Sequence, residues 1–339
     1  MDGNKNRKIM VTGGGGFLGH AIIRKLVEQG EQVWNFSRNS YPDLDVLGVH
    51  QIQGDLSDPE AVENAFSGMD LVFHVAAKPG VWGTYEEYYR PNVLGTQNVI
   101  QACKKNRVKN LIYTSSPSVI FTGNDMEGVD ESVPYPETTH THYTRTKTIA
   151  EKAVRQAAAN KEINAVILRP HLIWGPGDPH IVPRVIQRSK KLVRVGNRNN
   201  LVDTIYIDNA ADAHILAAKK LEENPSLSGK VYFISQDDPI PMWDMINGIL
   251  HAADLPPITR TLPVRAVWTI GAILEFVYTV FRISGEPRMT RFVANELGTA
   301  HWFDISAAKK DLGYRPNVST KEGFRRLKEW LTKHPIPVE

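Results

Sequence analysis

Two side chains in the run HYTRTK could transfer a proton. Tyr143 precedes Lys147 by four residues, a spacing that places both side chains on one face of a helix. A phenol ordinarily titrates at about 10, and a nearby ammonium lowers that pKa because it favours the ionised form. The spacing therefore predicts that Lys147 lowers the pKa of Tyr143, so that the phenol exchanges a proton near neutral pH. Tyr and Lys are common residues, so the pair alone also fits an ordinary solvated helix face.

A glycine-rich run near the N-terminus supplies a place for a cofactor. The segment KIMVTGGGGFLGHAIIRKLVEQG is typical of a buried strand, a glycine turn and a helix, and a second strand, QVWNFSR, follows. Gly13, Gly16 and Gly19 recur at three-residue intervals, which lets the backbone approach a pyrophosphate at the helix N-terminus. The pattern predicts a dinucleotide site rather than an ordinary tight turn, with Phe17 and Leu18 also contacting the cofactor.

The end of the second predicted strand indicates which dinucleotide binds. An acidic residue at this place usually binds the ribose hydroxyl of NAD, but here Ser37 is followed by Arg38. A hydroxyl and a guanidinium suit a 2′-phosphate, because arginine offers a planar fork of donors to phosphate oxygens. We therefore expect NADP(H). NAD(H) is the less favoured alternative, in which Arg38 is only a solvated charge. Asp55 and Leu56, in the run GDLSD, are expected to border the adenine.

Strands and helices continue to alternate after this start. LVFHVAA is expected to be a buried strand, whose last residues, Ala76 and Ala77, let the cofactor lie close to the backbone. A helix, VLGTQNVIQAC, and a strand, NLIYTSS, come next, and Ser116 ends that strand. The alternation predicts an α/β, Rossmann-type, doubly wound parallel sheet with its site at the carboxyl ends of the strands. Ser116 could donate a hydrogen bond to a developing oxyanion there, or merely satisfy its own turn.

The second half of the chain completes this sheet and then changes character. A helix, TIAEKAVRQAAA, is followed by the strand AVILRP and the loop HLIWGPGDPH. Pro170 and the glycines and prolines after it suit the rim of a cofactor or substrate site, although a plain connector is the alternative. YIDNAADAHILAAKKL and VYFIS are the predicted last helix and strand of the sheet. We expect an NADP-binding Rossmann domain over residues 1–173 and 203–236, and a smaller, mostly helical substrate-binding lobe over 174–202 and 237–339.

Composition excludes several classes of function. The 339 residues are 42% hydrophobic and 23% charged with a formal charge of +3, which fits a globular enzyme and argues against a nucleic-acid partner. Cys103 is the one cysteine, so no disulfide forms within the chain, and a buried thiol is favoured over a nucleophile. His140 and His142 would not share a helix face, and we expect no metal site. The first residues lack an apolar secretory core, so we expect a cytoplasmic protein.

One apolar segment complicates this interpretation. Residues 266–281, AVWTIGAILEFVYTVF, are almost wholly apolar and are interrupted only by Glu275. The segment is shorter than the roughly 20 residues that a membrane span requires. Three interpretations stay open: a core helix, an apolar entrance for the substrate, and an interfacial contact with the inner face of the membrane.

Taken together, TGGGGFLG, HVAA, YTSS, HYTRTK and RPHLIWGPGD resemble the extended short-chain dehydrogenase/reductase family of the NAD-dependent epimerase/dehydratase superfamily. This resemblance implies that Ser116, Tyr143 and Lys147 are catalytic, and that Asn92, in RPNVLGT, lies behind the active site. Closer similarity, carried by AAKPGVWG, TSSPSV, LIWGPGD, YIDNAADAH and GEPRMTRF, is to the 3β-hydroxysteroid dehydrogenase-like branch, especially the bacterial 2-alkyl-3-oxoalkanoate reductases of olefin biosynthesis. TSSPSVIF lacks the Tyr and Gly of many sugar-nucleotide epimerases, which disfavours a UDP-sugar substrate.

The resemblance implies NADPH-dependent reduction of a lipid-like β-keto acid with two long alkyl chains to the 2-alkyl-3-hydroxyalkanoate. It also implies a homodimer and association with other enzymes of the pathway and with the membrane surface. Lys78, His171 and Arg184 are candidates to recognise the substrate carboxylate, although each also fits a solvated or structural role. Two alternatives stay open: an NAD(P)-dependent 3β-hydroxysteroid or sterol-4-carboxylate dehydrogenase, and a regulator that binds NADP without turning it over.

Overall fold

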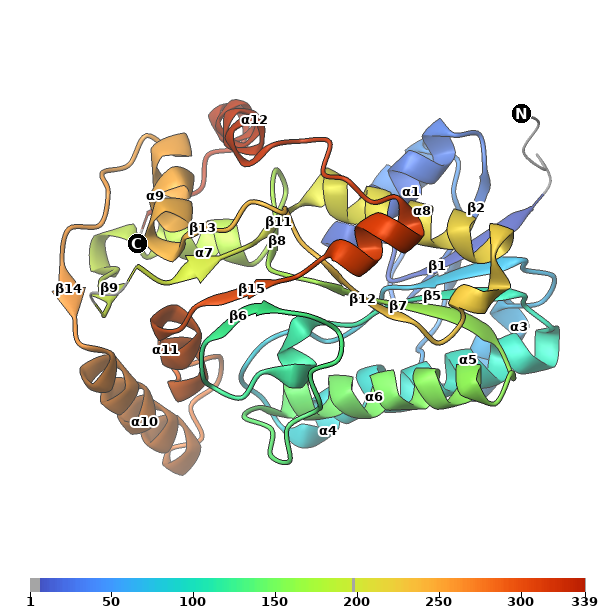
Figure 1. Ribbon diagram of the computed structural model, residues 1–339, viewed down its shortest axis with the longest axis horizontal. Helices are drawn as coiled ribbons and strands as arrows, with labels where there is room; N and C mark the ends of the chain where they lie inside the picture. The colour runs from blue at the N-terminus through green and yellow to red at the C-terminus, as the bar shows by residue number, and fades with distance from the viewer. Residues whose placement is uncertain (1–6, 197–198, 339) are drawn as a thin grey trace.

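A seven-stranded parallel sheet forms the centre of the protein (Figure 1). The structure is a computed structural model, which describes residues 7–196 and 199–338. The strand order is β12-β7-β5-β4-β1-β2-β3. The strands are β1 (Lys8–Thr12), β2 (Gln32–Ser37), β3 (His50–Gln53), β4 (Leu71–His74), β5 (Asn110–Thr114), β7 (Asn164–Pro170) and β12 (Val231–Ile234). The expected Rossmann-type sheet is thereby confirmed.

Helices cover both faces of this sheet. One face carries α1 (Phe17–Glu28) and α8 (Ile207–Glu223), and the other carries α3 (Pro59–Ala65), α5 (Gly95–Asn106) and α6 (His142–Ala159) (Figure 1). Because both faces are covered, the central strands are apolar in continuous runs, and every residue of β5 is buried. Cys103 is buried in the core between α5 and the sheet.

Strand register brings distant segments to one edge of the sheet. Thr12 in β1 pairs with His74 in β4, and Thr114 in β5 pairs with Leu168 in β7. All four strands are parallel, so the segments that follow them leave the sheet at the same edge. The chain reverses its winding direction between β1 and β4, and a crevice for a ligand is expected at such a point.

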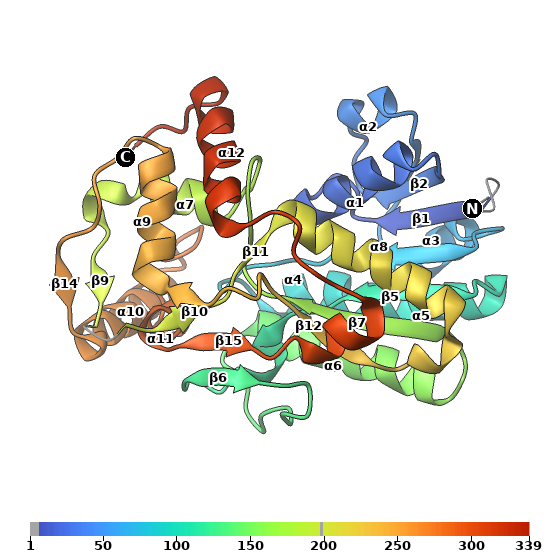
Figure 2. The ribbon, with the colours of Figure 1, turned by 45° about the horizontal axis from the view of Figure 1, so that its top comes forward.

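A second, smaller body is built beside this edge, at the left of Figures 1 and 2. It contains a four-stranded sheet in the order β13-β10-β15-β6 and two short strand pairs, β8 with β11 and β9 with β14. These strands are β6 (Met126–Val129), β8 (Ile173–Trp174), β9 (Arg194–Val195), β10 (Leu201–Val202), β11 (Ile205–Tyr206), β13 (Ile240–Pro241), β14 (Thr261–Leu262) and β15 (His301–Phe303). Its helices are α7 (Ile181–Gln187), α9 (Met242–Ala252), α10 (Val264–Val280), α11 (Arg291–Gly298) and α12 (Thr320–Lys333). The short helix α2 (Pro42–Val46) lies in a loop of the larger body, whereas α4 (Tyr85–Tyr89) continues through the π-helical turn Arg90–Leu94 directly into α5.

The division of the chain into two domains stays our proposal, and two segments cross the expected boundaries. Strand β6 lies within 1–173 but pairs with β15 in the smaller sheet. The turn at Ala308–Leu312 lies within 237–339 but packs against α8 and β12 of the larger body. The two bodies therefore share an interface that includes segments from both parts of the sequence.

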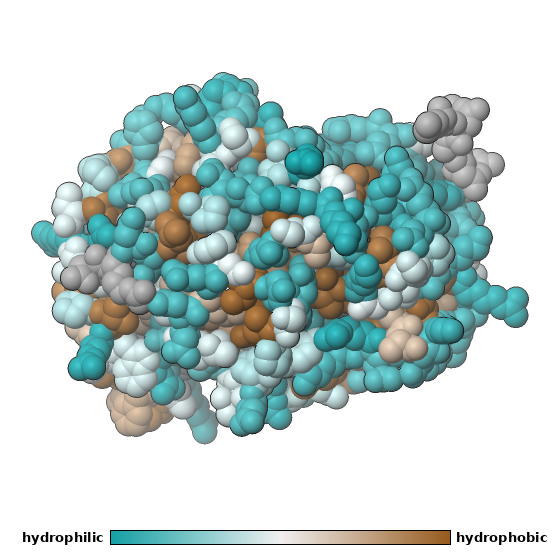
Figure 3. All heavy atoms as spheres, in the orientation of Figure 1, coloured by the Kyte–Doolittle hydropathy of each residue, from teal (hydrophilic) through white to brown (hydrophobic). Residues whose placement is uncertain are grey.

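The apolar segment forms α10, and the interpretation as a core helix is wrong. Only Val267 and Gly271 are buried within this helix. Phe276 and Phe281 are 66% and 71% exposed, and Trp268, Ile270, Ile273 and Val280 are exposed as well. Among the described residues no helix is both long and apolar enough to cross a membrane. By contrast, the face in Figure 3 is largely hydrophilic, with hydrophobic side chains in small separate groups.

Candidate active site

The glycine turn packs so closely against neighbouring backbone that side chains would not fit there. Gly13 has φ +74°, and a Cβ atom on it would lie 2.8 Å from the Cα of Ala76. A Cβ on Gly19 would lie 2.3 Å from the carbonyl oxygen of Gly13, so this glycine lets α1 pack against the turn. Gly16 precedes α1 without any side-chain cap, and the first N–H groups of the helix stay available to an anion. These residues fit the pyrophosphate of a dinucleotide.

The far end of the turn is basic. Arg38 and Arg90 both line the cavity, and their positive charges help the Ser57 hydrogen bonds to hold the pKa of Asp55 below its usual value. The hydroxyl of Ser37 accepts from Asn35 Nδ2 at 2.9 Å and donates to the Asn39 carbonyl at 2.8 Å. Arg90 was not predicted from the sequence. No local pattern marks it, because a π-helical turn (Arg90–Leu94) far along the chain from Arg38 carries it.

Tyr143 and Lys147 lie one turn apart in α6, as their spacing predicts. A capping box of Thr141 and Thr144 starts the helix one residue before Tyr143. Tyr143 lies close enough to Ser116, which follows β5, for the Ser116 hydroxyl to lower the pKa of the phenol. Lys147 Nζ donates to the Tyr113 hydroxyl at 2.8 Å and to the Thr114 carbonyl at 2.7 Å. The three predicted catalytic side chains therefore meet at the carboxyl end of β5.

The predicted effect of Lys147 on Tyr143 is not found. Burial raises the pKa of Tyr143 and the negative charge of Glu296 adds to this, while the nearby Ser116 hydroxyl acts in the opposite direction. Lys147 is directed to the end of β5 instead, and burial lowers its own pKa to about 7 against the attraction of Glu151. The phenol is consequently protonated at neutral pH, which is the state that a proton donor requires.

A buried ion pair fixes the base of this group. Arg169 in β7 donates to Glu151 in α6 through Nε at 3.1 Å and Nη2 at 2.5 Å. Glu151 also accepts from Ser115 and, at 2.6 Å, from the Tyr135 hydroxyl. The sequence analysis missed this pair, although a charged residue inside an otherwise apolar strand, as in AVILRP, is a usable signal. The network connects α6 to the segment that carries Ser116.

Asn92 lies behind these residues and is almost wholly buried. Its amide accepts from the backbone N–H of Lys78 at 2.7 Å and donates to the Thr146 hydroxyl at 3.1 Å. It thereby joins the loop after β4 to α6. Of the three candidates for carboxylate recognition, His171 and Lys78 line the cavity, and Lys78 is paired with Glu87. Arg184 does not line it and pairs with Glu286 at 3.0 Å.

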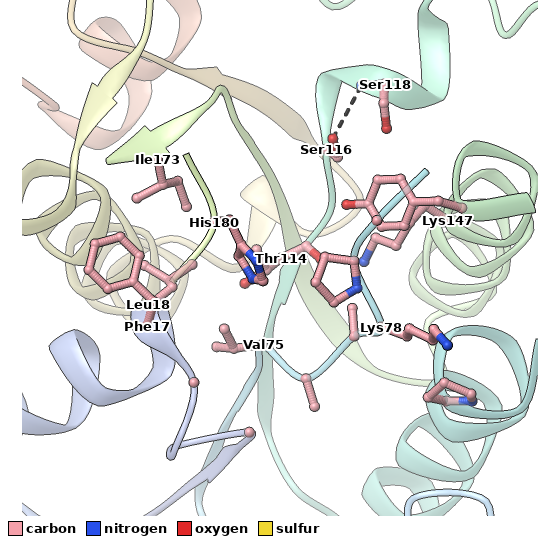
Figure 4. A pocket seen from close by; sticks show the side chains of 18 of the residues that line it. Phe17, Leu18, Val75, Lys78, Thr114, Ser116, Ser118, Lys147, Ile173 and His180 are labelled. Atoms are coloured by element: carbon pink, nitrogen blue, oxygen red, sulfur yellow. Dashed lines mark hydrogen bonds between the residues drawn. The ribbon is translucent and has the colours of Figure 1, made fainter. Parts of the chain in front are cut away.

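All of these features surround one cavity of about 1010 Å³ (Figure 4). Figure 4 shows Leu18, Val75, Ser116 and Lys147 around the same space. Every residue predicted to be catalytic or cofactor-binding lines it: Gly13, Gly16, Phe17, Leu18, Gly19, Ser37, Arg38, Asp55, Leu56, Ala76, Ala77, Ser116, Tyr143, Lys147 and Pro170. The same cavity is also lined by the apolar side chains of Phe121, Met126, Leu172, Ile173, Phe292 and Phe303.

Known proteins share this arrangement. The model of the 3-beta hydroxysteroid dehydrogenase/isomerase family matches residues 10–264. The 2-alkyl-3-oxoalkanoate reductase of Shewanella oneidensis is 50% identical over 95% of this chain and 85% of its own length, and that of Stenotrophomonas maltophilia is 48% identical over 95% and 98%. The mouse sterol-4-alpha-carboxylate 3-dehydrogenase, decarboxylating, is 34% identical over 96% of this chain and 91% of its own.

Solved structures share the fold. The crystal structure of gox2253 matches with a TM-score of 0.80 and 25% identity, covering 98% of this chain and all of that one. A UDP-glucuronic acid 4-epimerase from Bacillus cereus in complex with NAD matches with a TM-score of 0.73 and 23% identity, covering 96% of this chain and 99% of its own. At this identity the likeness concerns the fold alone.

The sheet, the glycine turn and the hydroxyl-bearing group at the strand ends define a dinucleotide-dependent oxidoreductase. The chain belongs to the 3-beta hydroxysteroid dehydrogenase/isomerase family. The resemblance drawn from the sequence motifs is thereby confirmed.

Proposed function

We propose that this protein uses NADPH to reduce a long-chain 2-alkyl-3-oxoalkanoate to the 2-alkyl-3-hydroxyalkanoate, a step in olefin biosynthesis. The observation that carries the proposal is that Tyr143 and Ser116 lie close together in the wall of a cavity of about 1010 Å³, which apolar side chains also line. Two hydroxyl groups there suit a carbonyl oxygen, and the apolar wall suits alkyl chains. The two bacterial relatives named for this activity, at 50% and 48% identity, support it.

The side chains have separate roles in this proposal. Bound NADPH supplies a hydride for the carbonyl carbon of the substrate. Tyr143 donates its proton to the carbonyl oxygen, and Ser116 donates a hydrogen bond to the same oxygen as negative charge develops on it. Lys147, held at the end of β5, binds the nicotinamide ribose. The raised pKa of Tyr143 keeps the proton in place until the oxygen becomes basic.

We infer that NADP(H) is preferred over NAD(H) because Arg38 and Arg90 line the adenosine end of the cavity and no carboxylate ends β2. A charge-assisted hydrogen bond to phosphate contributes about 1.5–3 kcal/mol. Arg38→Ala should therefore weaken NADP binding about 10- to 100-fold and leave NAD binding nearly unchanged, as measured by quenching of protein fluorescence. Equal losses for both dinucleotides would contradict a role for Arg38 at the 2′-phosphate.

The alternative substrate class is a 3β-hydroxysteroid or sterol-4-carboxylate, which the mouse relative at 34% identity favours. The same side chains would serve it, so only substrates can separate the two. A regulator that binds NADP without turnover is a third possibility, and it has no need of a buried proton donor.

The decisive experiment follows the reverse reaction, because the β-hydroxy acid is stable. Purified protein is mixed with a long-chain 2-alkyl-3-hydroxyalkanoate, or a steroid alcohol, and with NADP or NAD, and reduced cofactor is followed by absorbance. Turnover of the alkyl acid with NADP supports the proposal, whereas turnover of steroids alone supports the alternative. Tyr143→Phe should abolish turnover and spare NADPH binding. Tyr85→Phe, on α4 outside the cavity, is the matched control.

We also infer that the exposed face of α10 contacts the membrane surface near which the substrate is found. Phe276 and Phe281 are exposed, Arg282 directly follows Phe281, and Arg265 is exposed near the first residue of α10, a combination that suits anionic lipid. Phe276→Glu should abolish flotation with anionic liposomes, while Val46→Glu, at an even more exposed apolar residue on α2, should not. Wild-type protein that stays with the unbound fraction would refute this contact. Sedimentation of the same variants tests whether α10 forms the expected homodimer instead.

A further inference from the structure

Two buried histidines form part of the cavity wall apart from the catalytic group. His171 directly follows β7, and His301 begins β15; both line the cavity. Nε2 of His171 lies 3.1 Å from Nδ1 of His301. At the two ends of the pair, His171 Nδ1 lies 2.7 Å from the Asp203 carbonyl oxygen, and His301 Nε2 lies 2.9 Å from the Glu296 carbonyl oxygen. All four ring nitrogens are therefore engaged.

This geometry needs more protons than a neutral pair has. A carbonyl oxygen can only accept, so each end of the pair requires an N–H. The central contact between the two rings requires a third N–H, because two lone pairs at 3.1 Å repel each other. Two neutral imidazoles carry only two N–H groups, and each choice of tautomers leaves one contact without a proton. A pair with one added proton, and hence one positive charge, satisfies all three contacts.

The surroundings determine when this charge is present. Burial lowers the pKa of both imidazoles, because the interior solvates a cation poorly, and a charge on His301 would lower that of His171 further. Asp125 favours the charged form of His301. The Asp203 carboxylate is already bound by Ser235 and two backbone N–H groups. Burial disfavours the charged histidine pair, whereas the three hydrogen-bond contacts of the two rings favour it. An anion in the cavity would therefore shift the protonation equilibrium toward the charged pair.

Glu296 is the second group near the pair that could take up a proton. Its carboxyl lines the cavity, forms no hydrogen bond with any described residue, and has a pKa raised to about 7 by burial against the charge of Arg184. A test of proton uptake must therefore separate Glu296 from the histidines. Lys78 and Arg184, the other basic groups considered for the carboxylate, are paired with Glu87 and Glu286.

We propose that the His171–His301 pair is the element of this cavity that selects an anionic substrate, and that binding a carboxylate is coupled to the uptake of one proton by the pair. The proposal rests on the proposed function, in which the substrate is a β-keto acid. The register of β5 and β7 supports the placement, because residues that leave these two strands emerge at the same edge. His171 therefore follows β7 close to the level at which Ser116 follows β5. The carboxylate of a β-keto acid is two bonds from the carbonyl carbon, so both groups must lie in one cavity.

The test measures protons rather than turnover. Decanoate and its neutral amide, decanamide, are titrated into the NADP-saturated protein at pH 8 by calorimetry, in phosphate and in Tris, whose ionisation enthalpies differ. The difference in heat between the buffers counts the protons taken up. We expect clear proton uptake with decanoate, almost none with decanamide, and at least tenfold tighter binding of decanoate. Decanoate that binds no tighter than decanamide, or without proton uptake, would overturn the proposal with wild-type protein alone.

Substitutions identify the side chain that takes up the proton. His301→Gln should remove the proton uptake and weaken the binding of decanoate about tenfold, while the binding of decanamide and of NADPH stays unchanged. Glu296→Gln and His180→Gln, the latter at an exposed imidazole in the same cavity, should keep the uptake. Uptake lost in Glu296→Gln but retained in His301→Gln would transfer the role to Glu296 and refute ours. Turnover of the β-hydroxy acid is measured separately, so proton-coupled decanoate binding without turnover would reject the proposed function and retain this inference.

Discussion

Removing Arg169 should destabilise the protein strongly, because it leaves a charge buried without its partner. The side chains of Arg169 and Glu151 are 2% and 0% exposed, and two hydrogen bonds join them. In Arg169→Met the Glu151 carboxylate keeps only the neutral donors Ser115 and Tyr135. Breaking a buried pair in this way costs about 3–5 kcal/mol, a large part of the total stability of about 5–15 kcal/mol.

Urea unfolding followed by tryptophan fluorescence measures this cost. Glu151→Met should lower the free energy of unfolding by a similar amount. The double variant should lose about 1–3 kcal/mol less than the sum of the two single variants, because the second change removes a charge that is already unpaired. Lys105→Met, which breaks the exposed pair with Glu63, is the matched control and should cost about 0–1 kcal/mol. If Arg169→Met came within 1 kcal/mol of wild type, the argument from burial would be refuted.

Two further predictions concern the cofactor and pH. Gly13→Ala should abolish NADPH binding, because its Cβ would lie 2.8 Å from Ala76. Gly30 also has a positive φ, +79°, but has open space around it, so Gly30→Ala should cost only about 1 kcal/mol of stability and leave NADPH binding unchanged. Equal effects of the two variants on NADPH binding would contradict the close approach at Gly13. The pKa of Lys147 is about 7, against an ordinary value of 10.5. The positive charge of Lys147, and with it kcat/KM, should therefore fall as pH rises through 7. Because Glu151 raises the pKa of Lys147, Glu151→Gln should move this fall in kcat/KM to lower pH. The same depressed pKa destabilises the folded state at low pH, a cost that decreases as pH rises from about 7 to 10.5. A pH profile of kcat/KM that is the same in Glu151→Gln and wild type would exclude this coupling.

Local patterns were sufficient for much of the site. The glycine turn needs only a strand, a helix and a backbone free of Cβ atoms, all of which are contiguous in the sequence. Tyr143 and Lys147 share a helix face by spacing alone, and Ser116 lies at the end of a recognisable strand. For the apolar segment the pattern was not sufficient, because a helix that is apolar on nearly every face has no periodicity that separates a buried side from an exposed one.

The sequence by itself determined the class of fold, the dinucleotide turn and the residues available for proton transfer, because these depend on backbone geometry and on spacings of a few residues. Only the tertiary structure determined how the charged side chains are placed and paired. It directed Lys147 toward the end of β5, and it joined Glu151 to Arg169 across two elements. It also brought His301 to His171 across 130 residues of chain. Electrostatic energies depend on distance in space and on burial, and neither quantity can be read from positions along the chain.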